Sequence, residues 1–280
     1  KGAEYWLDTL AEAIKTEADK VRTETSRQTF EAKVAVIAAG FGSKLTEELG
    51  LRKFADAVGG AQADVESKEI EEVEIYFGRE VAPGFFAWLV PTSRRRARVG
   101  LLSRRDPGFY LKRLLTSLHA QGKIASPEAA ISYGGIPLKP LPCTYNERLI
   151  VVGDAAGQVK PTTGGGIYYG LLCADIAART LHRALQRNEF SAKALSRYER
   201  EWQQRLGQEL RIGYWARRLF EKLSDQQIDR IFDIVRTNRL DEALLKAEDL
   251  SFDWHSKAIL KLLGHQVIAR TLKVFKIPRN

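Results

Sequence analysis

The stretch GDAAGQVKPTTGGGIYYG, residues 153–170, follows directly on the apolar run LIVV, residues 149–152, in this chain of 280 residues. A short continuous apolar run is typical of a strand that is buried on both faces of a parallel sheet. Six glycines then occur within eighteen residues, although each glycine inside a regular element destabilises it by roughly 0.5–1 kcal/mol relative to alanine. This density predicts either a sharp turn or a ligand that comes very close to the backbone.

A helix is predicted after the glycines. Beyond Gly166 the apolar residues recur every three or four positions and form one stripe, which consists of Ile167, Leu171, Ala174, Ala178, Leu181 and Leu185. The first N–H groups of a helix have no partner within it and carry partial positive charge. Because Gly164, Gly165 and Gly166 have no Cβ, a phosphate or another electron-rich group can approach these N–H groups closely.

Two earlier residues complete the candidate site. Asp154 stands at the C-terminal end of the predicted strand, where open α/β sheets bind ligands, and its carboxylate can accept hydrogen bonds from sugar hydroxyls. Pro161 stiffens the approach to the glycines. Two other interpretations stay open: a helix start that only permits tight packing, and a first dinucleotide fingerprint at Gly164, Gly166 and Gly170. A first fingerprint usually follows its strand almost directly, whereas this one does not.

The rest of the chain contains patterns that predict further strands, an antiparallel sheet and helices. The run VAVIAAG, residues 34–40, predicts a second buried strand, and the alternating and aromatic stretches over residues 69–102 predict an antiparallel sheet. Residues 109–122 predict an amphipathic helix that stops at a glycine, and residues 131–141 a strand that breaks into a Pro-rich loop. Everything after Ser191 is predicted to be helical, with Ser224 and Gln227 as a capping box.

Composition excludes several classes of protein. No run of about 18 apolar residues predicts a transmembrane helix, and no signal peptide is visible at the first residues. The two cysteines, Cys143 and Cys173, fit a reducing compartment, so we expect a cytoplasmic protein. Four scattered histidines give no metal site.

The net charge of +9 favours anionic partners. The basic stretch SRRRAR, residues 93–98, raises nucleic-acid binding as an alternative, but no aromatic residues interleave with it, so a solvated hairpin is favoured. The basic amphipathic segment 256–275 predicts contact with an anionic membrane surface through Ile259, Leu260, Leu263, Val267 and Leu272. Packing of that segment on its own domain is the simpler alternative.

Residues 148–178 carry a family resemblance. The stretch RLIVVGDAAGQVKPTTGGGIYYGLLCADIAA resembles the second flavin-binding motif of the geranylgeranyl reductase family, FAD enzymes related in fold to p-hydroxybenzoate hydroxylase. The resemblance implies that Gly153 and Asp154 contact the ribityl and phosphate part of FAD. It also implies that Pro161 and the triple glycine pass beside the isoalloxazine ring, with the helix N-terminus at its pyrimidine edge.

Two further stretches support this resemblance. GREVAPGFFAWLVP, residues 78–91, is similar to the family's aromatic–x–Trp–x–x–Pro segment, which implies an isoprenoid site lined by Phe86, Trp88 and Pro91. VIAAGFGSKL, residues 36–45, resembles a strand and loop that usually read Ala-Asp-Gly-x-x-Ser. Gly40 and Ser43 match this pattern as cofactor-binding residues, whereas Ala39 replaces the Asp and removes whatever contact it would make.

No catalytic residue is assigned. Tyr168, Tyr169, Trp88 and Cys143 are candidates for lining the pocket or donating a proton, and Tyr168 is placed with the substrate-binding residues. None of the four has a spacing that proves the role, and a tyrosine on the first turn of a helix is as often packing as chemistry.

The resemblance covers roughly residues 20–190 and implies an α/β (α+β) fold. We expect a partial FAD-binding Rossmann-like parallel sheet, interleaved with an antiparallel substrate-domain sheet and followed by C-terminal helices. The expected regions are a remnant of the FAD-binding domain (1–60), the substrate or cap domain (61–141), the second FAD motif with its helix (142–190) and a helical region (191–280).

The implied function is FAD-dependent reduction of C=C bonds in a polyprenyl lipid or a prenylated (bacterio)chlorophyll-like substrate. The implied electron donor is NAD(P)H or a ferredoxin-like protein. Relatives of electron-transfer flavoprotein–quinone reductase, flavin monooxygenases and halogenases share the fold and remain alternatives. Two cysteines cannot supply four ligands to an iron–sulfur cluster, so only cluster-less relatives of the first group survive.

The first FAD motif of the family does not occur in these 280 residues. No GxGxxG unit precedes the strand at residues 34–40, and the sequence starts with Lys and contains no Met. We therefore expect that unit to lie upstream in a longer protein, and this chain alone to hold FAD weakly and to be inactive.

Overall fold

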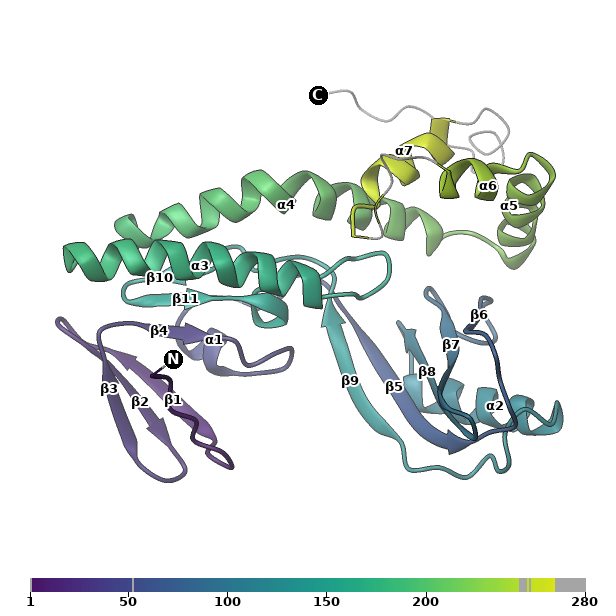
Figure 1. The fold of residues 1–280 in the computed structure, drawn as a ribbon, viewed down its shortest axis with the longest axis horizontal. Helices are drawn as coiled ribbons and strands as arrows, with labels where there is room; N and C mark the ends of the chain where they lie inside the picture. The colour runs from purple at the N-terminus through teal and green to yellow at the C-terminus, as the bar shows by residue number, and fades with distance from the viewer. Residues whose placement is uncertain (1, 52, 247–250, 252, 265–280) are drawn as a thin grey trace. The chain divides into compact units, whose positions relative to one another are not determined.

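The computed structural model describes residues 2–51, 53–246, 251 and 253–264 and divides the chain into two compact units (Figure 1). The first unit consists of Lys1–Asp56 and Pro137–Leu210, and the second of Ala57–Ile136 and Arg211–Asn280. The α/β (α+β) fold class is confirmed, because a parallel strand pair lies in the first unit and an antiparallel sheet in the second.

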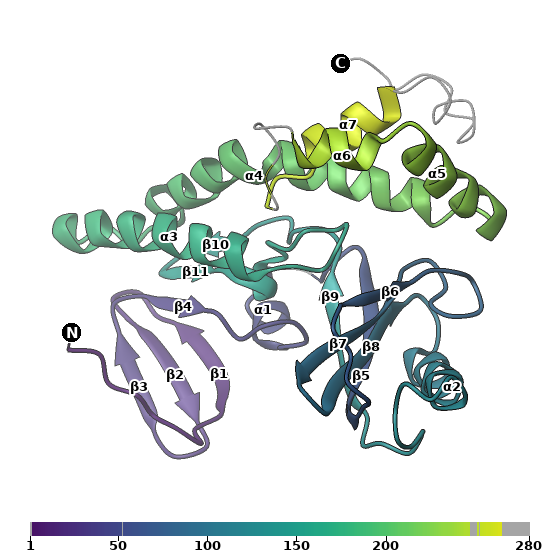
Figure 2. The same ribbon diagram turned by 45° about the vertical axis from the view of Figure 1, so that its right-hand side comes forward.

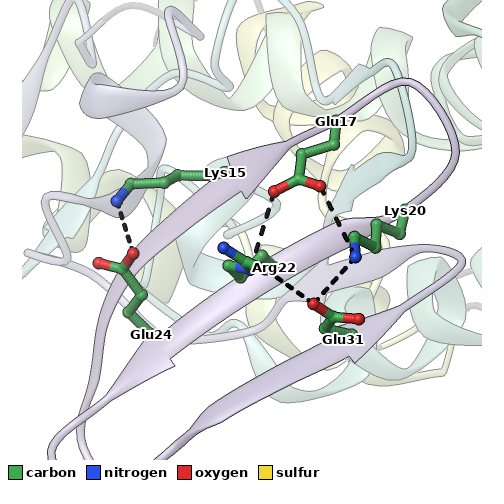
Figure 3. Close-up of polar contacts among 6 residues, drawn as sticks. All are labelled: Lys15, Glu17, Lys20, Arg22, Glu24 and Glu31. Carbon is green, nitrogen blue, oxygen red and sulfur yellow. Dashed lines mark hydrogen bonds and ion pairs between the residues drawn. The ribbon is translucent and has the colours of Figure 1, made fainter.

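The first unit begins with a small antiparallel sheet that the sequence analysis missed. Its strands are β1 (Ala11–Thr16), β2 (Val21–Thr25) and β3 (Thr29–Ala32), in that order. Figure 3 shows the polar contacts that cross it: Glu31 accepts from Arg22 at 2.9 Å and from Lys20 at 3.0 Å, and Lys15 pairs with Glu24 at 2.5 Å. These strands carry paired charges rather than an alternating apolar face, so the usual strand signal is weak.

The two apolar runs found in the sequence are neighbouring parallel strands, but only the second is buried on both faces as predicted, because Val36 in the first is 45% exposed. β4 (Ala35–Ile37) pairs in parallel with β11 (Leu149–Val151), with Val151 opposite Ile37, and β10 (Tyr145–Asn146) pairs antiparallel on the other side of β11. All three residues of β11 are buried. Below them lies a core shared with the short helix α1 (Leu45–Glu48).

Helix α3 (Ile167–Arg187) forms where a helix was predicted, but the predicted apolar stripe is not the face that packs. Ile167 is 84% exposed and Leu171 67% exposed. The buried residues are Tyr169, Cys173, Ile176, Ala177, Thr180 and Ala184. In its first turns the helix comes close to the end of β11, since a Cβ on Gly170 would lie 3.5 Å from the Cα of Gly153. The buried face combines small residues with Tyr169 and Ile176, so the apolar stripe found by periodicity is the exposed one.

The second unit contains a five-stranded sheet in the order β6-β7-β8-β5-β9. The strands are β5 (Ala57–Glu66), β6 (Glu74–Tyr76), β7 (Ala87–Ser93), β8 (Arg96–Ser103) and β9 (Ser132–Pro137). The sheet extends beyond residues 69–102, because β5 and β9 join it. β5 gave little signal since two glycines interrupt its apolar pattern.

Helix α2 (Pro107–Ala120) covers one face of this sheet, where it contacts β5 and β8 (Figures 1 and 2). Its buried leucines pack with Leu89, Val99 and Leu101 in one core. The basic stretch 93–98 forms the β7–β8 turn, where Arg94 pairs with Glu69 and Arg98 with Asp64. These pairs fit a solvated hairpin.

The C-terminal region is mostly helical where the structure describes it, apart from turns and an isolated antiparallel bridge between Ser251 and Trp254. Its helices are α4 (Ala192–Phe220), α5 (Asp225–Thr237), α6 (Leu240–Leu245) and α7 (Ser256–Gly264). The capping box predicted at Ser224 and Gln227 starts α5, with both reciprocal bonds formed. Val267 and Leu272 of the predicted membrane-contacting segment lie outside the described residues. Among those described, no helix combines the length and the apolar character needed to cross a bilayer.

Candidate functional site

The carboxyl ends of β4 and β11 lie side by side, and the candidate cofactor residues follow them. The amide of Val152 donates to the carbonyl oxygen of Ile37 at 2.9 Å, so both strands end at one edge. Gly40 comes three residues after β4, with a left-handed φ of +73°, and the hydroxyl of Ser43 accepts from the amide of Leu45 at 3.3 Å. Gly153 and Asp154 follow β11 at the same edge, which is where parallel sheets bind ligands.

A single 3-10 turn, Gly153–Ala156, carries Asp154, and glycines begin and follow it. Gly153 has φ +67° and Gly157 has φ +76°, a region that side chains rarely adopt. A Cβ on Gly157 would also come within 2.6 Å of the carbonyl oxygen of Lys139, so both backbone shape and space require glycine there. Gly153 has nothing within 4 Å of a Cβ and is required by its φ alone.

A buried network fixes this turn to the end of β11. The amide of Gly153 donates to Oε1 of Gln158, Nε2 of Gln158 donates to the Tyr198 hydroxyl, and that hydroxyl donates to the carbonyl oxygen of Val151, each at 2.8 Å. Gln158 and Tyr198 are fully buried. The sequence analysis missed both. A glutamine among small and apolar residues was the available signal, but its partner lies forty residues further on.

Asp154 lies half-buried at the start of α3. Burial raises the pKa of its carboxyl above the ordinary value of 3.8. No group in the described part of the chain makes a hydrogen bond to this carboxylate. A Cβ on Gly166, the N-cap residue of α3, would overlap Oδ1 of Asp154, and no side chain caps the helix. An unpaired acceptor and an uncapped helix N-terminus therefore lie together.

The loop before α3 is a closed turn. The amide of Lys160 donates to the carbonyl oxygen of Gly165 at 3.1 Å, and the amide of Gly164 donates to that of Lys160 at 2.9 Å. Pro161 is buried in this turn, and Gly164 needs its glycine because φ is +79°. Gly165 differs, since a Cβ there would make only ordinary contacts, at 3.5 Å to Thr163 and 3.6 Å to Lys160. The fold does not require a glycine at that exposed position.

The remaining candidates of the first unit divide into core and surface. Tyr169 is 1% exposed, and the ammonium of Lys160 lies 5.6 Å from its ring centroid. Cys143 donates from Sγ to the carbonyl oxygen of Tyr145 at 3.1 Å, and burial raises the pKa of its thiol. Tyr168, 41% exposed, stays accessible. Buried Lys160 was another residue that the sequence analysis did not single out.

The aromatic residues predicted for the substrate lie in the second unit. Trp88 lines a cavity of about 190 Å³ together with glycines of β5 and β9. Its indole lies across Gly100, where a Cβ would overlap the ring. Phe86 meets Trp88 edge to face, with ring centroids 6.0 Å apart. Pro91 lies further along β7, opposite Ala97, and is not among the residues lining this cavity.

Among the described residues, no three His, Cys, Asp or Glu side chains gather in a group able to hold an ion. The arrangement in the first unit suits an electron-rich organic ligand with hydroxyl groups, because it offers an acceptor, open backbone and helix N–H donors.

Known proteins resemble the chain in sequence. No protein-family model matches it. It is 33% identical over 218 residues to a digeranylgeranylglycerophospholipid reductase of Methanocaldococcus jannaschii, covering 74% of this chain and 55% of that protein. It is 32% identical over 216 residues to digeranylgeranylglycerophospholipid reductase 2 of Methanothermobacter thermautotrophicus, covering 73% and 54%. The chain thus spans about half the length of these curated relatives.

Solved structures share its fold. A geranylgeranyl bacteriochlorophyll reductase-like protein of Thermoplasma acidophilum matches with a TM-score of 0.79 at 23% identity, covering 97% of this chain and 70% of that one. The flavin-dependent halogenase CmlS matches with a TM-score of 0.60 at 14% identity, covering 91% and 54%. At these identities the likeness concerns the fold alone.

Proposed function

The chain belongs to the geranylgeranyl reductase family, and from that premise we propose that it is part of an FAD-dependent oxidoreductase that reduces C=C bonds of a polyprenyl lipid. One observation carries the proposal. The unpaired carboxylate of Asp154, the open backbone at Gly165 and the uncapped start of α3 meet at the carboxyl ends of two parallel strands.

The residues present fit the flavin. A half-buried carboxylate without a partner is destabilising, so hydroxyl donors of a ribityl chain would restore what Asp154 lacks. Gly40, Ser43 and Gly153 would flank that part of the ligand. Pro161 and the triple glycine would hold the ring system, where Gly165 leaves space that a side chain would fill. The helix N-terminus suits a ring edge that gains negative charge.

In the proposed reaction the cofactor supplies the hydride, and the protein binds and orients the substrate. Reduction of a C=C bond places a hydride on one carbon and a proton on the other, and bound, reduced FAD supplies the hydride. The protein positions the alkene, excludes water and provides the positive end of α3. Tyr168 lies one residue into that helix, is accessible, and is proposed as a substrate contact. We assign no catalytic acid.

The proposed contacts with the isoprenoid substrate lie in the second unit. Trp88 and Phe86 present aromatic surface beside glycines, which suits a flat, branched isoprenoid chain. Pro91 is included as a contact for a chain that extends along β7. The electron donor is proposed as NAD(P)H or a ferredoxin-like protein. An anionic membrane surface is proposed to meet α7, on which Leu260 is 45% exposed.

The test is flavin retention by the full-length protein. Asp154→Ala removes a charge-assisted acceptor worth about 1.5–3 kcal/mol, which is roughly a ten- to hundredfold loss of FAD affinity. Asp175→Ala is the matched control, because Asp175 is an exposed aspartate of α3 in a surface ion pair. Equal FAD affinity in the Asp154 variant and the wild type would overturn the assignment.

A second assay tests the reaction itself. The flavin-loaded protein is incubated with a reductant and a digeranylgeranyl lipid, and mass spectrometry follows the gain of two hydrogen atoms per reduced bond. Halogenation or hydroxylation of an aromatic substrate with no alkene reduction would instead favour the chemistry of the halogenases that share the fold.

A further inference from the structure

The five-stranded sheet of the second unit has two different faces, and helix α2 packs on only one of them. Successive side chains of a strand point to opposite faces, and Leu89 and Val99 take the face that forms a core with α2. Trp88 and Gly100 are the neighbours of these two residues in sequence and lie opposite each other across β7 and β8, so they belong to the other face. Ile75 of β6 lies opposite Trp88 and shares that face, where it is 45% exposed.

Aromatic rings continue this second face beyond the cavity at Trp88. Phe86 lies two residues before Trp88 and contacts its ring, and the ring centroid of Phe77 lies 6.1 Å from that of Phe86. The centroid of Phe77 also lies 5.5 Å from that of Phe232 on α5 and 5.7 Å from that of Phe220 at the end of α4. Four rings in successive contact therefore form an aromatic row, which consists of Trp88, Phe86, Phe77 and Phe232.

The aromatic row lies at the surface. Its first three rings are partly buried, and Phe232 is 53% exposed. Exposed apolar side chains that adjoin one another, rather than standing singly, are typical of a ligand groove or an interface. The other end of the row opens on the cavity of about 190 Å³ that Trp88 lines. Because an apolar cavity of about 150 Å³ holds one benzene molecule, this cavity suits one isoprene-sized group, and the rest of a longer chain would lie outside it.

Charges limit the same face in the opposite direction. Arg98 lies two residues before Gly100 on β8, and its Nε donates to the carboxylate of Asp64 on β5 at 2.8 Å. The two residues are opposite each other in the sheet. An apolar chain that crossed this ion pair would separate charged groups from water without burying them in return. The favourable direction for an apolar chain that leaves the cavity is therefore along Phe86 and Phe77 towards Phe232.

We propose that the aromatic row binds the isoprenoid chain of the substrate beyond the group held at Trp88, with Phe232 in contact with the part of the chain furthest from the cavity. The inference rests on the proposed function and adds Phe77 and Phe232 to the substrate contacts. An isoprenoid chain has no polar groups to satisfy and buries carbon against each ring that it crosses. Each further isoprene unit should therefore raise the affinity.

The surroundings of Phe232 favour a chain over a protein as the occupant. A stable protein interface buries about 800 Å² on each partner, which calls for a broad surface. Asp229 and Arg236 lie one turn before and one turn after Phe232 on α5, and both are exposed. The apolar surface at this ring is therefore narrow, which suits a single chain.

The experiment is calorimetric titration of the full-length protein with geranyl, farnesyl and geranylgeranyl diphosphate, each below its critical micelle concentration. These ligands share one head group and differ in the number of isoprene units, so differences in affinity report the chain alone. Wild-type protein should bind more tightly with each added unit. Phe232→Ser should weaken binding of geranylgeranyl diphosphate about fivefold and leave that of geranyl diphosphate within about twofold, because the shorter chain ends before this ring.

Phe109→Ser is the matched control, because Phe109 is 51% exposed and lies on α2, which covers the other face of the sheet. It should leave all three affinities within about twofold. The proposal is overturned by absence of saturable binding of geranylgeranyl diphosphate, by an affinity that does not rise with chain length, or by equal weakening in the two variants. Equal weakening of the shortest and longest ligands by Phe232→Ser also overturns it, since the substitution would then act on the fold.

Sedimentation of the same proteins tests the competing occupant. If Phe232→Ser dissociates a dimer and leaves the ligand affinities unchanged, the face is an interface between copies and the proposal is wrong. The titration needs neither flavin nor reductant, so loss of the proposed reduction and loss of chain binding are observed separately.

Discussion

Replacing Gly165 or Gly166 by alanine should separate the needs of the fold from those of the ligand. A Cβ on Gly166 would overlap Oδ1 of Asp154 and lie 3.4 Å from Val159, so Asp154 or the helix must shift. Overpacking of this kind destabilises by about 1–3 kcal/mol. A Cβ on Gly165 meets nothing closer than 3.5 Å. With φ outside the left-handed region, Gly165→Ala should leave stability unchanged or raise it by about 0.4–1 kcal/mol.

Affinity for FAD should show a different pattern. If the ring system lies against the backbone at Gly165, the added methyl group occupies its place, and binding should weaken by at least about tenfold, or 1.4 kcal/mol. The two quantities are measured separately, by denaturant unfolding of the flavin-free protein and by flavin fluorescence titration. Unchanged FAD affinity in Gly165→Ala would refute the close approach. Destabilisation of the flavin-free protein by Gly165→Ala as large as that by Gly166→Ala would refute the spatial argument itself.

Three other sites give predictions that can be tested by single substitutions. Gln158→Leu leaves the Gly153 amide without an acceptor and removes the donor to the Tyr198 hydroxyl, which keeps its own bond to Val151. It should therefore lower the free energy of unfolding by about 1–3 kcal/mol, whereas Gln203→Leu on the exposed side of α4 should change it little. Burial raises the pKa of the Asp154 carboxyl in the folded, flavin-free protein above its ordinary value of 3.8. The stabilisation that the protonated carboxyl contributes is therefore complete below pH 3.8 and is lost as pH rises through the raised pKa. Asp154→Asn should remove this decrease from a plot of the free energy of unfolding against pH. Gly100→Ala should displace the Trp88 indole, change its fluorescence and lower stability by about 1–3 kcal/mol, while Gly134→Ala, which meets nothing within 4 Å, is its control.

Those parts of the fold could be predicted in which a short, local residue pattern specifies one structural element. The runs at 34–40 and 149–152 are apolar without alternation, which is typical of strands in a parallel sheet, and they pair as β4 and β11, although Val36 of β4 is exposed. The capping box at Ser224 is similarly local. The buried face of α3 was not predictable from periodicity, because apolar residues lie both on that face, with Tyr169 and Ile176, and on the exposed one, with Leu171.

In the candidate site, too, residues of one local motif could be predicted, whereas residues distant in sequence could not. Asp154 and the glycines stand in one short motif, so sequence alone brought them together. Gln158 and Tyr198 are separated along the chain and meet only through folding. No local pattern distinguishes Gly165, where the fold tolerates a side chain, from Gly166, where it does not. That difference depends on where the Asp154 carboxylate lies in space.

Because charged pairs cross the N-terminal sheet, the stability of the pairing among β1, β2 and β3 depends on salt concentration and temperature. Single exposed pairs such as Lys15–Glu24 contribute little, and salt screens them over about 10 Å at 0.1 M. The shared contacts of Glu31 with Lys20 and Arg22 form a small network instead. Heating makes the hydration of ions less favourable, so such networks gain relative strength as temperature rises. Amides of β2 should therefore exchange faster in concentrated salt, and that sensitivity should be absent from the apolar pairing of β4 with β11.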